Sequence, residues 1–248
     1  MVREPPTVLD TSARVAAALA AFAAFDLAAP HIGHDLGAVV EVAGLGLISI
    51  PLATLVPRTM LRSVSVGAWM LPATAMAVAA TAGLILAGHP TGTPATLTKL
   101  CAASLLGLAL GSLLESGAEI VGVALLIAAV DIYSVEAGPT RVIVEHHAGV
   151  LNDFTLALHP IGSAGVAQIG ASDFLFLAVF LSAAHRFDLR VDAGWLAMTA
   201  SFGITVLVSY LFDRDLPALP LLSLSFLLVN AAPLRARMRG RNGSPERE

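Results

Sequence analysis

One apolar run near the middle of the chain carries a single ionisable residue; it reads Ile169-Gly170-Ala171-Ser172-Asp173-Phe174-Leu175-Phe176 and stays apolar to about residue 185. A second run of the same kind, one apolar segment earlier, contains Asp131. A carboxylate at membrane depth costs several kcal/mol unless another group pairs with it or uses it. If these runs span a membrane, Asp131 and Asp173 are therefore candidates for a functional site.

The composition indicates a membrane protein. Hydrophobic residues make up 56% of the chain and charged residues 13%, with a mean hydropathy of +0.81. Soluble domains have about 45–50% and about 25%. The single cysteine excludes a disulfide framework and a cysteine metal site. Apart from the C-terminal arginines, no basic cluster suits nucleic acid, so we expect no nucleic-acid partner. We also expect no metal and no cofactor.

Eight apolar segments predict an all-α, polytopic transmembrane helical bundle, since a span needs about 20 residues. Their approximate bounds are 13–29, 37–55, 64–87, 97–114, 117–135, 167–185, 193–212 and 216–234. We divide the chain into N-terminal scaffold helices (1–116), a catalytic core that carries both Asp motifs and the Pro-Ala-Leu-Pro motif (117–234), and a basic, disordered cytoplasmic tail (235–248). The Gly107-Leu108-Ala109-Leu110-Gly111 stretch predicts close helix packing, because small residues let helix backbones approach each other.

The arginines predict the orientation. With eight spans both termini share one side, and eleven of the fourteen basic residues fall there; the other three are Lys99, Arg141 and Arg214. Cytoplasmic loops carry the excess of Lys and Arg. We therefore expect an integral membrane protein with both termini in the cytoplasm, in the plasma membrane of a prokaryote.

The two aspartates are expected at similar depths. Asp131 lies four residues inside Val135, about 6 Å, and Asp173 six residues inside Ala167, about 9 Å, at about 1.5 Å per helical residue. The segment Pro217-Ala218-Leu219-Pro220 opens the last apolar run at the same level. This coincidence predicts one site in the outer half of the membrane.

The residue types at this site suit peptide hydrolysis. Two facing carboxylates in a dry site share one proton, so the ionised partner can activate water while the protonated one polarises a carbonyl. Gly170 offers a thin helix face to a substrate backbone. The prolines interrupt regular helix and leave carbonyls free to pair with an unwound substrate.

At these residues the chain resembles the presenilin and signal peptide peptidase family of intramembrane aspartyl proteases. That family carries Tyr-Asp on one helix, Gly-x-Gly-Asp on the next and Pro-Ala-Leu-Pro on the last. The counterparts here are Val130-Asp131, Gly170-Ala171-Ser172-Asp173 and Pro217-Ala218-Leu219-Pro220. Ser134-Val135 also resembles the Ser-Val that often follows the first Asp in microbial members. The resemblance covers roughly residues 117–234.

The resemblance implies a presenilin-like C-terminal core and an intramembrane aspartic endopeptidase. Its substrates would be transmembrane helices or remnant signal peptides in the bilayer. Asp131 and Asp173 would be catalytic, and the substrate-binding residues would be Gly170, Ser172, Pro217, Ala218, Leu219 and Pro220. Three features depart from the family: Val130 replaces Tyr, Ser172 replaces the second Gly, and eight spans stand where the family usually has nine, so nine spans remain possible.

Two other functions remain open. A proton- or cation-coupled transporter can use paired intramembrane carboxylates as relay sites. A catalytically weak protein that binds membrane helices would keep the same motifs. Among the remaining polar residues, we expect Asp26 and Glu41 to face headgroups, residues 154–161 to be interfacial or re-entrant, and residues 141–145 to be extended.

Overall fold

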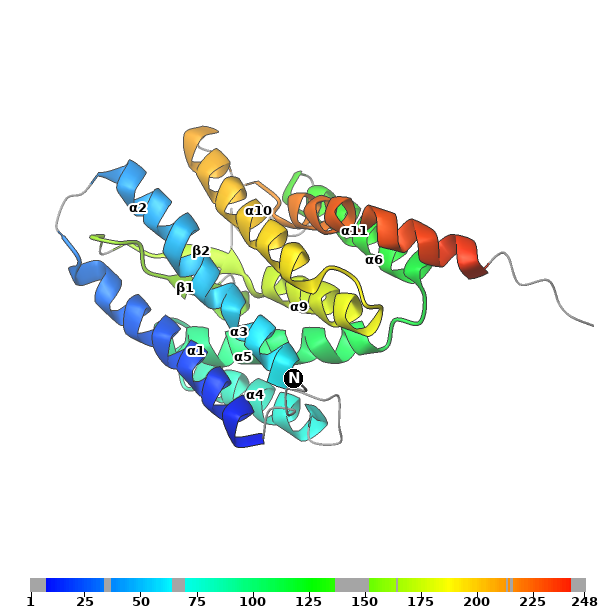
Figure 1. Ribbon diagram of the computed structural model, residues 1–248. Coiled ribbons are helices and arrows are strands. Elements are labelled where there is room, and N and C mark those ends of the chain that lie inside the picture. The colour runs from blue at the N-terminus through cyan, green and yellow to red at the C-terminus, as the bar shows by residue number, and fades with distance from the viewer. Residues whose placement is uncertain are drawn as a thin grey trace, which may run out of the picture.

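The computed structural model describes residues 8–33, 37–63, 70–136, 152–163, 165–212, 214 and 216–241. Most of these residues are helical (Figure 1). The elements are α1 (Val8–Ala28), η1 (Ala29–His31), α2 (Ala38–Gly44), η2 (Leu45–Ser49), α3 (Ile50–Ser63), α4 (Met70–Leu86), α5 (Thr93–Ser112), α6 (Gly117–Glu136), β1 (Thr155–Leu158), β2 (Ala167–Gly170), α9 (Ala171–Arg186), α10 (Val191–Phe212) and α11 (Leu219–Arg241).

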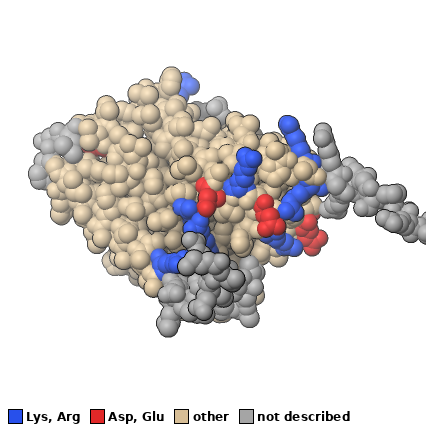
Figure 2. Space-filling view, in the orientation of Figure 1, with Lys and Arg blue, Asp and Glu red and all other residues tan. Residues whose placement is uncertain are grey.

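The predicted all-α polytopic bundle is confirmed. Six helical stretches in the described part of the chain are long and apolar enough to cross a membrane: Ser12–His31, Ala38–Arg62, Thr93–Ser112, Gly117–Val135, Val191–Phe212 and Leu219–Met238. Helix α4, with 17 residues, and α9, with 16, are shorter. Figure 2 shows a largely uncharged surface on this face, with charged side chains gathered toward one end, as expected for a protein embedded in lipid.

Helix α9 lies at the centre of the bundle, with α5, α10, α3 and α11 packed around it (Figure 1). All its side chains from Leu177 to Ala184 are buried, and Phe174, Leu177, Phe180 and Leu181 are each 0% exposed. A helix that is apolar all round is expected in such a position. Because α9 is surrounded by protein rather than lipid, it need not match the thickness of the bilayer.

The two glycines predicted to allow close packing lie where α5 crosses α9. A Cβ atom on Gly107 would come within 2.2 Å of the Leu175 carbonyl oxygen, and one on Gly111 within 2.4 Å of the Val179 carbonyl oxygen. The Ser182 hydroxyl donates a 2.9 Å hydrogen bond to the Leu108 carbonyl at the same crossing. The glycines therefore fix how deeply α9, and the Asp173 that it carries, sits in the bundle.

Two local expectations were wrong: the disorder of the tail at residues 235–241, which continue α11, and the helical start at residues 167–170. Residues 167–170 form strand β2 rather than the first turn of a helix, so α9 begins at Ala171. The apolar stretch before it forms β1, which pairs antiparallel with β2; Leu156 lies opposite Ile169, and Leu158 opposite Ala167. Leu156 and Leu158 are fully buried, because this short hairpin packs against α5. The expectation that residues 154–161 are interfacial or re-entrant stays a prediction. The expected extended segment 141–145 lies outside the described residues.

Candidate functional site

Asp131 lies in the penultimate turn of α6, and its carboxylate is hydrogen-bonded to the first residue of α11. The backbone N–H of Leu219 donates a 3.0 Å hydrogen bond to Asp131 Oδ2. Leu219 is the first residue of α11, so its N–H has no acceptor within that helix. The positive end of the α11 dipole also points at this carboxylate, which favours a negative charge there.

Asp173 is the third residue of α9 and is only 9% exposed. Gly170, which precedes the helix, is extended with φ −58° and ψ 132°. A Cβ atom at Gly170 would lie 3.2 Å from Asp173 Oδ2 and 3.1 Å from Ser172 Oγ. The carboxylate therefore folds back over Gly170, which explains why the smallest residue stands at this position.

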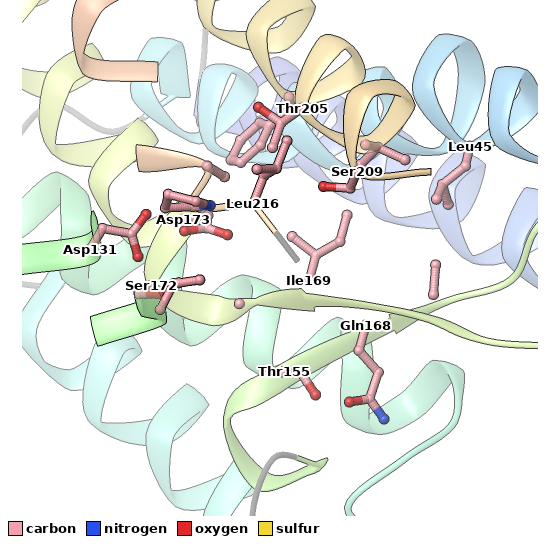
Figure 3. Close-up of a pocket in the computed structure, with 17 residues that line it drawn as sticks. Leu45, Asp131, Thr155, Gln168, Ile169, Ser172, Asp173, Thr205, Ser209 and Leu216 are labelled. Atoms are coloured by element: carbon pink, nitrogen blue, oxygen red, sulfur yellow. The ribbon is translucent and has the colours of Figure 1, made fainter. Parts of the chain in front are cut away.

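Both carboxylates open into one cavity of about 370 Å³ (Figure 3). Its walls come from α6, β1, β2, the start of α9, α10 and residues 216–218, with Leu45 of η2 at one end. Figure 3 shows the side chain of Asp131 pointing toward Asp173 across this space. The expected juxtaposition of the two aspartates is therefore present, although by a different local geometry, since Asp173 stands in the first turn of α9 and not deep within it.

The predicted substrate-binding residues divide between two neighbouring cavities. Gly170, Ser172, Pro217 and Ala218 line the cavity that holds the aspartates. Leu219 is buried and contacts that site through its bond to Asp131. Pro220 lines a second, more apolar cavity between α6, α10 and α11, which shares Thr205, Leu216 and Pro217 with the first. The roles of these residues in binding stay predictions.

Sequence reasoning missed the polar wall that faces the aspartates from α10. Thr205 and Ser209, four residues apart, line the cavity on one side of that helix (Figure 3). From β2, Ile169 points into the cavity, whereas the Gln168 side chain donates a 2.6 Å hydrogen bond to Asn152 Oδ1. The i, i+4 spacing of Thr205 and Ser209 in an apolar helix was the one available sequence signal.

One departure from the family motifs lies away from the site. Val130, at the position of the expected Tyr, is 56% exposed on the outer face of α6 and does not line the cavity. Ser172 lines it, with its hydroxyl beside Gly170. The departure at Ser172 therefore bears more directly on the aspartates than the departure at Val130.

The expectation that Asp26 faces headgroups was wrong. Its side chain is 3% exposed and accepts hydrogen bonds from the Thr93 hydroxyl (2.7 Å) and the His159 backbone N–H (3.1 Å), with His159 Nδ1 also at 3.1 Å. The carboxylate can be buried because these donors, which come from distant parts of the chain, replace its hydrogen bonds to water. Within the described ranges, no three His, Cys, Asp or Glu side chains converge as metal ligands would.

Comparison with known proteins gives one partial similarity. A segment of 61 residues, 24% of this chain, is 39% identical to a presenilin-like protein of Arabidopsis thaliana. The matched segment covers 15% of that relative. No protein-family model matches the chain. The similarity supports a presenilin-like membrane protein and leaves its activity to be argued from the site.

Proposed function

We propose that this chain is an intramembrane aspartyl protease that hydrolyses peptide bonds within transmembrane helices or remnant signal peptides. The observation that carries the proposal is the pair Asp131 and Asp173, which face each other across one cavity inside a membrane-spanning bundle. The backbone N–H on Asp131 and the segment at residues 216–218 border the same space. The similarity to a presenilin-like protein supports the same reading.

We propose different roles for the two carboxylates, because their surroundings differ. Asp131 is partly exposed and accepts the Leu219 N–H at the N-terminus of a helix, so it carries the negative charge. Asp173 is buried and holds the shared proton. A water between them gives one proton to Asp131 while its oxygen attacks the scissile carbonyl carbon, and Asp173 donates its proton to the carbonyl oxygen. The product of this step is a neutral gem-diol.

Collapse of the gem-diol completes the reaction. Asp131 returns its proton to the amide nitrogen, and Asp173 recovers a proton from one gem-diol hydroxyl as the carbonyl re-forms. The C–N bond then breaks to leave an amine and a carboxylic acid. Both aspartates regain their starting states, so the cycle needs no metal and no covalent intermediate.

Strand β2 is the element best placed to hold an unwound substrate. Ala157 of β1 exchanges hydrogen bonds with Thr96 on the side away from β2. In an antiparallel pair its partner Gln168 must also point its N–H and C=O away from the hairpin. Gln168 borders the cavity, and its backbone groups bond to no group in the described part of the chain. A substrate strand can add to this edge.

The orientation and location are part of the proposal. Arginine placement supports cytoplasmic termini in a prokaryotic plasma membrane. In that orientation α6 runs outward, as in the signal peptide peptidase branch that the sequence resembles. Substrates with a cytoplasmic N-terminus are therefore expected.

The test is cleavage of a single-span model substrate by purified protein in lipid bilayers. Asp131→Asn and Asp173→Asn should each abolish cleavage, and the double variant should be no worse, because the two groups act as a unit. Asp192→Asn is the matched control, since Asp192 is exposed and pairs only with Arg58 and Arg62 in the described structure. Residual cleavage by either single variant would contradict the dyad, and retained substrate binding without cleavage by the wild type would assign a binding role instead.

A further inference from the structure

The outer edge of β1 is capped by side chains from the N-terminal helices. Alternate residues of an extended strand turn their backbone groups to the same edge. Here the Thr155 carbonyl accepts a 2.9 Å bond from Lys99 Nζ, and the Ala157 carbonyl and N–H bond to Thr96 Oγ1 at 3.0 and 3.2 Å. The next position in this series, His159, gives its N–H to Asp26. Each outward-facing residue from 155 to 159 thus meets a polar side chain of α1 or α5.

Lys99 is the only lysine in the sequence, and its burial is unusual for a charged group. It is 4% exposed, and its ammonium also donates to the carbonyls of Pro90, at 2.6 Å, and Asn152. All three donors of the ammonium are therefore satisfied by backbone oxygens. This arrangement clamps the chain just before β1 to the first turns of α5.

Asp26 forms the second clamp, at the other end of β1. Its carboxylate accepts from His159, immediately after the strand, and from Thr93 at the start of α5. The turn beyond is held as well, since the Gly162 N–H donates a 2.8 Å bond to the Ala29 carbonyl. Burying a lysine and an aspartate is costly unless their bonds replace those to water. The bonds of Lys99 to Asn152 and Thr155, and those of Asp26 to His159, fix the hairpin and its flanking residues to α5 and α1.

We propose that Asp26, Thr96 and Lys99 are positioning residues that keep the β1–β2 hairpin formed in the absence of substrate. A two-stranded hairpin is only marginally stable on its own. These side chains supply the hydrogen-bond partners that a third strand would otherwise give to the outer edge of β1. On the opposite edge, beside the aspartates, no described residue bonds to the outward backbone groups of Gln168 in β2. Strand β2 leads directly into Gly170 and Asp173, so fixing the hairpin also fixes the approach to the cavity. The functional half of this inference rests on the proposed proteolysis.

Hydrogen–deuterium exchange of the substrate-free protein in lipid bilayers tests the structural half. In the wild type, peptides that cover residues 152–170 should exchange slowly. Lys99→Met, Asp26→Asn and Thr96→Val should each speed that exchange about tenfold, which corresponds to the loss of about one hydrogen bond. Peptides from α6 and α11 should keep their wild-type protection. Thr98→Val is the matched control, because among the described residues the Thr98 hydroxyl bonds only to the Ala95 carbonyl of its own helix.

Kinetics test the functional half. A preformed edge lowers the ordering cost of binding, so the same variants should raise the KM for a model substrate about tenfold while kcat changes less than about threefold. Thr96→Val keeps the shape of its side chain and tests the inference even if Lys99→Met fails to fold. Unchanged exchange at residues 152–170 in Thr96→Val, or equally faster exchange across all helices, would overturn the inference. If the wild type cleaves nothing, the proposed proteolysis fails while the exchange data still decide the role of the anchors.

Discussion

Replacing Gly170 with alanine tests whether the carboxylate geometry limits activity. The backbone at Gly170 (φ −58°, ψ 132°) is open to any L-residue, so the substitution brings no backbone strain. The added methyl would lie 3.2 Å from Asp173 Oδ2 and 3.1 Å from Ser172 Oγ, which requires these groups to shift by a few tenths of an ångström. A misplacement of about 1 Å can cost about a hundredfold in rate. We therefore expect kcat to fall roughly tenfold for a shift of this smaller size.

Stability should change little in the same variant. Gly→Ala substitutions at compatible positions change the free energy of unfolding by about 0.4–1 kcal/mol, usually in the stabilising direction. Gly122→Ala is the control, since Gly122 lies on the exposed face of α6 with nothing within 4 Å of its would-be Cβ atom. The assay is cleavage of a single-span substrate at matched folded concentration, with the thermal midpoint measured in parallel. Wild-type kcat in Gly170→Ala, or a lower rate fully explained by unfolding, would refute the reasoning.

Three further outcomes are expected. The rate should depend on pH as a bell, falling at low pH as Asp131 and Asp173 both become protonated and at high pH as both become ionised; a single-limbed profile of kcat/KM would contradict the shared proton. Gly111→Val should lower the free energy of unfolding by about 3 kcal/mol or more, because α5 must move away from α9. The control Gly83→Ala, where the added methyl meets no atom within 4 Å, should leave the free energy of unfolding nearly unchanged. Unfolding titrations in detergent measure both. Pro220→Ala should lower cleavage several-fold with folding preserved, because it loosens the start of α11 that aligns the Leu219 N–H on Asp131; unchanged cleavage would remove this segment from the mechanism.

The sequence predicted those parts of the site that depend on local pattern. An Asp in an apolar run and a pair of prolines at a helix entrance are visible without a structure. Asp131, Asp173 and Pro217 accordingly line one cavity, as expected. The hairpin was missed because membrane spans are found from the hydrophobicity of about 20 consecutive residues. Strands of four residues, such as β1 and β2, leave no separate signal over that length. In Thr155-Leu156-Ala157-Leu158 no β-branched run marks a strand, and only pairing with β2 reveals it.

The buried charges of the N-terminal helices could not be predicted for a different reason. Asp26 and His159 are 133 residues apart, and Lys99 and Asn152 are 53 apart, so the bonds that allow burial join remote segments. A sequence read alone assigns such residues to the membrane surface, where water and headgroups supply partners. Several of their true partners belong to or flank a strand whose existence was itself not predicted: Thr155 in β1, Asn152 before it and His159 after it. The two errors therefore have one cause.

The identity of the partner separates two kinds of charged residue within the apolar helices of this chain. Asp26 and Lys99 have their polar atoms saturated by the hairpin, its flanking residues and Thr93, so little capacity remains for a substrate. Asp131 and Asp173 instead face a cavity, and Asp131 is held by one backbone N–H that leaves its second oxygen for another donor. Saturated charges position the wall of the cavity, and unsaturated ones are available for chemistry. Substitutions in the two sets should therefore have different effects. A substitution at Lys99 should lower the affinity for substrate, whereas one at Asp173 should lower turnover.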